Sequence, residues 1–165
     1  MTLAADDSGA DPLATIVEQF GLHIGRAMGW PPMAGRAAGV LILSERPLTS
    51  AELQETLGAG KGSVSETTRL LMTNGVVERV KEPGSRHFVY RWRDDAWVGC
   101  LRHQLEATTR LLHLAQSAEE HGAELSAGQR ERLGEMLDYY RFMVSQLESL
   151  LTDYTARWEA RRSQP

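Results

Sequence analysis

The sequence predicts a mainly α-helical protein with one small β-hairpin, an α+β fold class, and three observations support this. Six stretches repeat apolar residues at the three- and four-residue spacing of helices. One segment, residues 76–93, changes to the two-residue alternation of strands on either side of Pro83-Gly84. The last helical stretch keeps a 3.5-residue apolar repeat, which is typical of a long helix that packs along a partner.

Composition indicates one ordinary domain, or a small domain with an extension. The chain has 165 residues, of which 42% are hydrophobic and 24% charged, which is enough for a real core. No apolar run approaches the roughly 18 residues of a membrane span, and the acidic start lacks the basic region of a signal peptide. We therefore expect a cytoplasmic protein with no membrane partner. Cys100, the single cysteine, excludes an internal disulfide and is interpreted as a small core residue, with a redox role as the alternative.

The first helix is predicted after a short tail. Residues 1–10 are small and acidic, which favours a disordered N-terminal tail. Asp11 then stands at an N-cap position, with Pro12 as the first helical residue. Apolar residues follow at helical spacing until Gly29 and the Trp-Pro-Pro after it, which end the helix.

The next two helices differ in character. Residues 33–44 are rich in alanine and glycine, so a neighbouring helix can approach this one closely. A short helix follows, in which Thr49 and Glu52 have the spacing of a capping box and Gly58 ends the element. The first of these helices is therefore expected in the core.

A second short helix repeats the capping-box pattern. Ser63 is predicted as its N-cap, with Glu66 at the reciprocal position and Gly75 at its end. Residues 59–62 would then form the turn between the two short helices. The hairpin of residues 76–93 follows directly.

Two long helices complete the chain. From Asp94 the sequence is helical until a break near Gly122, with one apolar face made of Trp97, Leu101, Leu105, Thr108, Leu112 and Ala115. Ser126 and Gln129 begin the last helix with a further capping-box pattern. Its 3.5-residue seam is predicted to pair with the same helix, or its neighbour, in a second copy; the predicted dimer-interface residues are Leu133, Leu137, Tyr140, Val144, Leu147, Leu151, Tyr154 and Trp158.

The segment LGAGKGS allows two incompatible interpretations. A phosphate-binding loop needs the pattern G-x-x-x-x-G-K-[ST] after a buried strand, but Glu55 stands at the first glycine and Gly62 at the hydroxyl position. The preceding residues also have the cap and spacing of a helix. A helix-turn-helix fits better, because the second helix of that motif enters the DNA major groove with short, polar and basic residues at its start. The hairpin would then act as a wing.

The charge distribution favours a DNA partner. Residues 58–93 carry seven basic and three acidic side chains, a net +4 within a chain of net −4, so one segment is basic and the remainder acidic. Arg69 would read a guanine or neutralise a phosphate, and Arg86 at the hairpin tip suits a minor groove. A chance cluster of solvated charges is the alternative. The predicted DNA-binding residues are Thr49, Lys61, Ser63, Ser65, Glu66, Thr67, Arg69, Lys81 and Arg86.

Three segments carry a family resemblance: VEQFGLHIGRAMGWPPMAGRAAGVLILS, LTSAELQETLGAGKGSVSETTRLLMTNGVVERVKEPGSRHFVYRW and RLGEMLDYYRFMVSQLESLL. Over roughly residues 13–158 the chain resembles winged-helix regulators of the MarR type, and most of all their GbsR branch. The resemblance implies a winged helix-turn-helix over 31–93 and dimerisation through an N-terminal helix at 11–30 and a C-terminal helical region at 94–162. It also implies a homodimer on an inverted-repeat DNA operator.

The same resemblance implies a transcriptional regulator, usually a repressor, associated with osmoprotectant or transport genes and relieved by a small-molecule effector. It supplies no compact ligand motif. Trp30, Trp97, Tyr139 and Tyr140 would suit a quaternary ammonium through cation–π contacts, although core packing explains these aromatic residues at least as well.

We expect no enzyme activity, no cofactor and no metal site. No catalytic spacing is recognisable, and the histidines are too scattered for a metal site: His23, His87, His103, His113 and His121. The alternative function is a helical protein–protein adaptor that uses the winged helix as a scaffold, followed by a nucleotide-dependent phosphotransferase.

Overall fold

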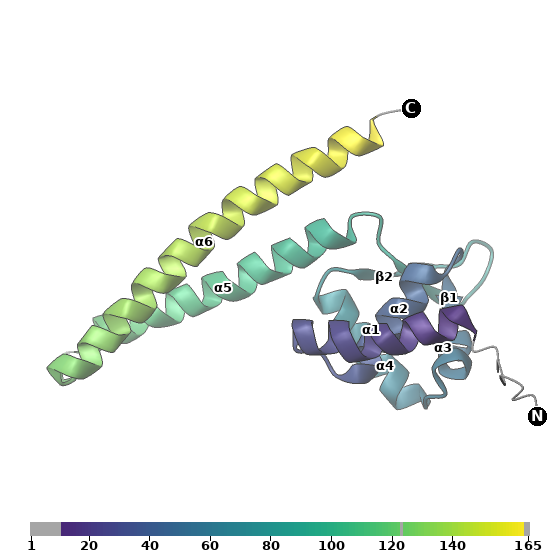
Figure 1. Cartoon of the computed structure of the whole chain (residues 1–165), viewed down its shortest axis with the longest axis horizontal. Helices are drawn as coiled ribbons and strands as arrows, with labels where there is room; N and C mark the ends of the chain where they lie inside the picture. The colour runs from purple at the N-terminus through teal and green to yellow at the C-terminus, as the bar shows by residue number, and fades with distance from the viewer. Residues whose placement is uncertain (1–10, 123, 164–165) are drawn as a thin grey trace, which may run out of the picture. The chain divides into compact units, whose positions relative to one another are not determined.

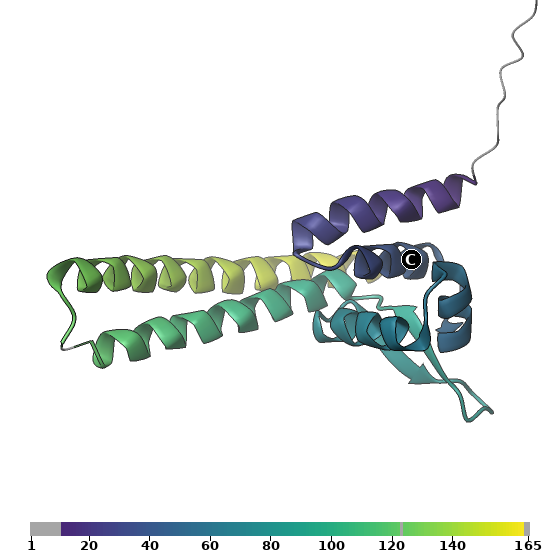
Figure 2. The same ribbon diagram turned by 90° about the horizontal axis from the view of Figure 1, so that it is seen from below.

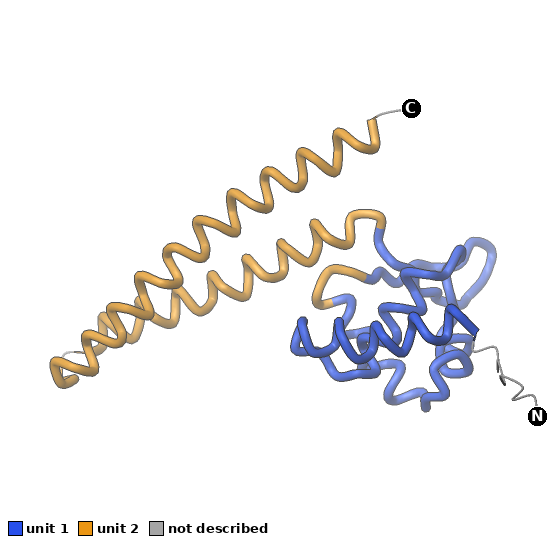
Figure 3. Tube along the Cα trace, in the orientation of Figure 1, with its two compact units in different colours: residues 1–72, 77–93 blue, residues 73–76, 94–165 orange. Residues whose placement is uncertain are grey.

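The computed structural model describes residues 11–122 and 124–163, and its contacts divide the chain into two compact units (Figure 3). The first unit holds the described residues up to Met72 together with Val77–Arg93. The second holds Thr73–Val76 and the described residues from Asp94 onward. The tail predicted at residues 1–10 lies outside the described residues.

The secondary structure confirms a mainly helical fold with a small antiparallel sheet (Figure 1). Among the described helices, none is both long and apolar enough to cross a membrane. The second unit is built from α5 (Ala96–Glu120) and α6 (Ala127–Arg162). The first unit contains, in chain order, α1 (Pro12–Met28), α2 (Pro32–Leu43), β1 (Leu48–Thr49), α3 (Ser50–Leu57), α4 (Lys61–Thr73, whose last residue falls in the second unit), β2 (Val77–Lys81) and β3 (Phe88–Trp92).

Helices α1 and α2 pack closely because small residues line their contact. Asp11 caps α1 as predicted, accepting a hydrogen bond from the Leu13 amide at 3.1 Å. A Cβ atom on Gly35 of α2 would stand 2.7 Å from the Phe20 carbonyl oxygen and 2.9 Å from the Cα of Gly21, which only glycine tolerates. The predicted close approach is thus confirmed, and the small residues of α2 are all buried: Ala34, Gly35, Ala37, Ala38 and Gly39.

Helices α3 and α4 form a helix-turn-helix, but α4 begins earlier than predicted. Gly58 ends α3 in the left-handed conformation, with φ 60°. The chain is helical again from Lys61, and the Val64 amide donates to the Gly60 carbonyl at 3.1 Å. Ser63 lies inside the helix, so the prediction that it is the N-cap is wrong. A glycine N-cap costs only a few tenths of a kcal/mol relative to serine, so the burial of Val64, which is 1% exposed, decides where the helix begins.

The turn between these helices covers residues 58–60, not 59–62 as predicted. It joins one helix to another, whereas a phosphate-binding loop leaves a buried strand. The phosphate-loop interpretation therefore has no structural context.

The predicted hairpin is confirmed, and a third strand extends its sheet. β2 pairs antiparallel with β3, with Val77 opposite Trp92 and Lys81 opposite Phe88. β1 pairs with the other edge of β3, which gives the order β1-β3-β2. The sequence does not predict β1, because two residues are too few to show alternation.

In the second unit, α5 and α6 lie side by side as an antiparallel pair (Figures 1 and 2). Ser126 and Gln129 form the predicted capping box at the start of α6. The predicted seam of α6 is its least exposed face, and Leu137 and Leu147 are buried there. Its other members are half-buried: Leu133, Tyr140, Val144, Leu151, Tyr154 and Trp158.

The predicted seam of α6 therefore packs against α5 of the same chain. The short turn after α5 brings the two helices together, and their pairing extends to the far end of α6. There the Trp158 indole N–H donates to the Asp94 carbonyl at 3.1 Å, and Arg162 forms an ion pair with the Asp94 carboxylate at 3.1 Å. Contact of the seam residues with a second chain stays a prediction.

Two glycines hold the segment after α4 against α5 within the second unit. α4 ends at Thr73, close to the predicted end at Gly75, whose φ of 74° is left-handed. A Cβ atom on Gly99 of α5 would overlap the Gly75 carbonyl oxygen. The backbones therefore touch directly, and neither position has room for a side chain.

Candidate nucleic-acid interface

The start of α4 presents a polar and basic face to solvent. Its inner face packs into the first unit through Val64, Thr67, Thr68 and Leu71. Thr67 is only 7% exposed, because its position on the helix faces the core, and its contact with DNA stays a prediction. Ser63 is half-buried, and the exposed predicted residues are Lys61, Ser65, Glu66 and Arg69.

The cations of this face are free of carboxylates. Within residues 11–122 and 124–163, neither Lys61 nor Arg69 has an acidic side chain within ion-pair distance. Lys61 is the first residue of α4, where the helix dipole adds positive potential, while Arg69 lies two turns further along the helix. An exposed helix start with unpaired cations is what a phosphate backbone attracts.

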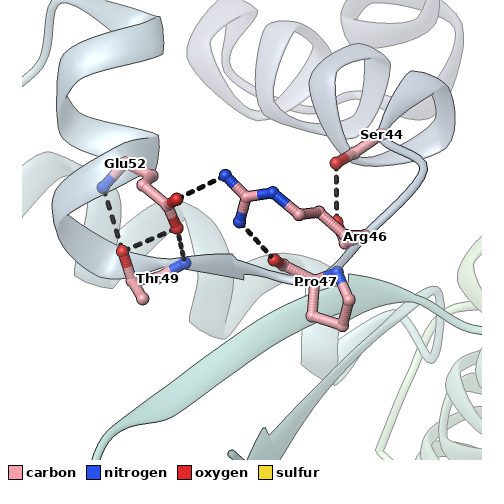
Figure 4. Close-up of polar contacts among 5 residues, drawn as sticks. All are labelled: Ser44, Arg46, Pro47, Thr49 and Glu52. Carbon is pink, nitrogen blue, oxygen red and sulfur yellow. Dashed lines mark hydrogen bonds and ion pairs between the residues drawn. The ribbon is translucent and has the colours of Figure 1, made fainter.

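The start of α3 is held by a hydrogen-bond network around Glu52 (Figure 4). One Glu52 oxygen accepts from the Thr49 amide at 2.7 Å and from its hydroxyl at 2.9 Å, while that hydroxyl accepts from the Glu52 amide at 3.2 Å. The predicted capping box is thus confirmed. Thr49 is half-buried in this network, and its contact with DNA stays a prediction.

Arg46 completes the network from the loop after α2. Its guanidinium forms an ion pair with Glu52 at 2.6 Å and donates to the Pro47 carbonyl at 3.2 Å, while the Ser44 hydroxyl donates to the Arg46 carbonyl at 2.6 Å (Figure 4). The hydrogen bond from Arg46, followed by those from Thr49, lowers the pKa of Glu52 to about 2. These contacts fix the point at which the helix-turn-helix begins.

The tip of the wing is a narrow, hydrogen-bonded turn. The Glu82 amide donates to the His87 carbonyl at 3.0 Å, and the Ser85 amide donates to the Glu82 carbonyl at 3.1 Å. Lys81 and Arg86 are exposed beside this turn, and neither has a carboxylate partner in the part of the chain that the structure describes. The structure thus leaves both predicted wing cations available to a ligand.

Sequence reasoning missed two side chains on the wing strands. The Arg79 guanidinium carbon lies 3.8 Å from the centroid of the Phe88 ring, and both residues are exposed. Arg91 differs, because it forms an ion pair with Glu78 at 2.6 Å. The two-residue period of the hairpin would have placed Arg79 and Phe88 on one face, but no spacing rule predicts their stacking.

The four aromatic residues predicted to line an effector pocket belong to both units. Trp30 is buried in the first unit. In the second unit, Trp97 lies at the start of α5, the end that contacts Trp158, whereas Tyr139 precedes Trp158 by 19 residues, about 28 Å of helix. Tyr139 and Tyr140 contact each other edge-on, with ring centroids 5.1 Å apart. Trp97 and the two tyrosines therefore lie far apart within one chain, and their role in binding an effector stays a prediction.

A cavity of about 440 Å³ opens in the first unit between α1, α2 and the β1–α3 segment. Its lining is largely apolar and includes Val40 and Leu48, both 9% exposed. The lining also contains Arg36 and Glu18, which form an ion pair at 2.8 Å. A cavity of this size and mixed chemistry can hold a small molecule.

Neither the cysteine nor the histidines point to further chemistry. Cys100 is half-buried, and burial raises the pKa of its thiol, which favours the protonated and less reactive form. The described residues contain no cluster of three or more histidine, cysteine or acidic side chains that could hold a metal ion.

Known proteins resemble this chain in sequence. Residues 95–161 match the family model of an MmpR5-like MarR family transcriptional regulator. YvaV of Bacillus subtilis (strain 168), which its name describes as an HTH-type transcriptional regulator, is 27% identical over 84% of this chain and 90% of its own. The HTH-type transcriptional repressor OpcR of the same organism is 31% identical over 41% of this chain and 36% of its own.

A solved structure is similar as well. The crystal structure of a transcriptional regulator superposes with a TM-score of 0.80 and 27% identity, covering 87% of this chain and 98% of that chain. These similar proteins are regulators of transcription and not enzymes.

Proposed function

We propose that this chain is a transcriptional regulator of the MarR-like winged-helix type that binds a specific DNA site as a homodimer and represses transcription there, and the comparisons support this. One observation carries the proposal: the exposed face of α4 bears Lys61 and Arg69, and neither forms an ion pair within residues 11–122 and 124–163, although Glu66 lies on the same helix. The wing that follows α4 adds Lys81 and Arg86 in the same condition. These cations gather on a helix-turn-helix and its wing, although the whole chain is acidic.

In this proposal α4 enters the major groove by its N-terminal half. Ser65 and Arg69 reach base edges, while Lys61 and the positive end of the helix bind the phosphate backbone. Arg86 enters the neighbouring minor groove, whose negative potential favours arginine. Base contacts then supply the specificity, and phosphate contacts supply the register.

The homodimer would form through apolar surface that one chain leaves uncovered. On α5 and α6 a set of large apolar side chains is exposed: Trp97, Leu111, Leu114, Tyr139, Phe142 and Leu150. On α1 a second exposed set consists of Leu13, Ile16, Leu22 and Met28. Clusters of this kind mark interfaces, and a two-fold dimer presents its two α4 helices to the half-sites of an inverted repeat.

We further propose that the chain belongs to the GbsR branch and that a small-molecule effector relieves its repression. The segments PPMAGR and GKGSVS support the branch, and the partial match to the repressor OpcR supports the sign of regulation. The cavity beside Arg36 supports an effector site in the first unit, while Trp97 and Tyr139 remain exposed aromatic candidates for ligand contact.

Selection from a library of randomised duplexes tests the proposed function. The purified protein should enrich an inverted repeat, bind it as two protomers, and prefer it about 10³-fold or more over random duplex at physiological salt. Sedimentation of the complex gives the stoichiometry. If the protein enriches no sequence and shows only weak binding that salt abolishes, the proposal fails. The exposed apolar side chains of α5 and α6 would then favour a protein-binding adaptor.

A further inference from the structure

The strands of the wing present two chemically different faces. Strand alternation and the β2–β3 register place Arg79, Lys81 and Phe88 on one face, and Glu78 and Arg91 on the other. Arg79, Lys81 and Phe88 are all exposed, and we term these three residues the outer wing face. It carries two cations and one aromatic ring.

The cations of the two faces differ in how they are neutralised. Arg91 is held by Glu78, with 2.6 Å between Nε and Oε1, so its charge is largely compensated. Arg79 and Lys81 have no carboxylate partner among the residues that the structure covers. The outer wing face therefore presents uncompensated positive charge to solvent, and such a surface attracts a polyanion.

Phe88 gives Arg79 a defined orientation. The guanidinium carbon lies 3.8 Å from the ring centroid, well inside the distance limit for a cation–π contact. Stacking covers one flat side of the guanidinium and leaves its N–H edge free to donate. A stacked arginine also loses less rotamer entropy when it binds a phosphate. Phe88 remains 44% exposed, so this surface is open to a ligand.

We propose that the outer wing face binds the DNA backbone and that Phe88 is a positioning residue that orients Arg79 toward a phosphate. This inference rests on the proposed function, and it extends the DNA contact from the tip of the wing to its strands. Arg79 and Lys81 are two residues apart on β2, which separates their Cα atoms by about 6.7 Å. Each cation can therefore meet a different phosphate.

Arg79→Gln and Arg91→Gln form a matched pair of variants. Each removes one positive charge from the same hairpin, but from opposite faces. The probes are the duplex that the wild-type protein selects and a random duplex of equal length, titrated at several salt concentrations between about 50 and 200 mM. Arg79→Gln should lower the salt slope by about one. It should also weaken binding to both duplexes by the same factor, because a phosphate contact carries no sequence information. Arg91→Gln should leave the slope at the wild-type value.

Phe88→Leu separates orientation from charge. It keeps an apolar side chain but removes the ring, so binding should weaken about two- to fivefold, the effect of losing an exposed cation–π pair. The salt slope should not change, because Arg79 keeps its charge. The loss should disappear in the Arg79→Gln background, and Phe88→Tyr should restore binding. A purely structural role for Phe88 would instead weaken binding equally in both backgrounds and overturn its assignment as a positioning residue.

Wild-type binding separates this inference from the proposed function. If the wild type binds its selected duplex but Arg79→Gln keeps the wild-type salt slope, or loses no more affinity than Arg91→Gln, the outer wing face is not a DNA contact and the regulator remains. If the wild type selects no duplex, the proposed function itself has failed, and this inference fails with it. Thermal unfolding of each variant shows that the losses do not come from misfolding.

Discussion

At the scale of single residues, Arg69 is the side chain best placed to read a base. It is exposed on α4 and has no carboxylate partner among residues 11–122 and 124–163. Arg69→Ala should weaken binding to the selected duplex more than binding to random duplex. The difference should be about 1–3 kcal/mol, the value of a bidentate contact to a base. The ratio of the two dissociation constants measures this. Arg91→Gln should leave that ratio unchanged, and an equal loss on both duplexes after Arg69→Ala would assign Arg69 to a phosphate.

Glu52 makes a residue-scale prediction about pH. Its pKa falls from 4.5 to about 2 in the folded protein, so the charged form is stabilised by folding. This contribution is present above the unfolded pKa of 4.5 and is lost as the pH falls toward about 2. Glu52→Gln keeps an acceptor for the Thr49 amide but cannot form the ion pair with Arg46.

Urea unfolding of wild type and Glu52→Gln between about pH 3 and pH 7 measures this contribution. The difference in unfolding free energy should be largest near neutral pH and should shrink below about pH 4.5, where the unfolded carboxyl takes up its proton. A difference that stays constant over the whole range would mean that the charge of Glu52 does not stabilise the start of α3.

At the scale of elements, the contact between α1 and α2 depends on glycine. A Cβ on Gly35 would meet backbone atoms of Phe20 and Gly21 at 2.7–3.0 Å, and backbone cannot yield as a flexible side chain does. Gly35→Ala should therefore lower the free energy of unfolding by about 1–3 kcal/mol, the cost of overpacking. Gly62→Ala in α4, where nothing lies within 4 Å, is the control. Equal stability of both variants would show that the helices separate without cost.

The elements that sequence predicts well are those fixed by local contacts. Asp11, Thr49 and Ser126 each accept a hydrogen bond from an amide within three residues, so their caps are visible in the sequence. The start of α4 is different, because burial of Val64 overrides the preference for Ser63 as N-cap. β1 exists only through its pairing with β3, which no local pattern records.

The same distinction applies to the candidate interface. The basic segment is visible in the sequence, but which cations remain free depends on their partners in space. Arg91 is neutralised by Glu78 thirteen residues away, while Arg79 is stacked on Phe88. Thr67 likewise lies on the buried face of α4, and only the packing of that helix shows which of its faces is buried. The charge of residues 58–93 therefore predicts a DNA partner, but only the fold shows which of their cations are free to contact it.

At the scale of the whole molecule, the second unit leaves large apolar side chains exposed. The seam between α5 and α6 is filled from within the chain, with Leu137 and Leu147 buried. Leu114, Phe142 and Leu150 are nevertheless 50–60% exposed. A homodimer would give these side chains a partner and would also supply the second α4 that an inverted repeat requires.

Phe142→Glu tests the dimer without disturbing the fold of one chain. Phe142 lies outside the filled seam of α6, so the variant should keep its helix content. A carboxylate buried in the dimer interface should raise the dimer dissociation constant about 30-fold or more, as expected for a hot spot of 2 kcal/mol. Thr152→Glu is the matched control, because it adds the same charge to α6 at an exposed position that is not three or four residues from Phe142 or Leu150, the spacing at which side chains on a helix are neighbours. Sedimentation gives the oligomeric state of each variant.

Titration with the complete operator and with one half-site shows the consequence for DNA binding. Monomers should bind one half-site and lose the preference for the complete inverted repeat. A Phe142→Glu variant that stays dimeric would instead place the interface on the apolar face of α1, because that is the other exposed apolar set among the described helices.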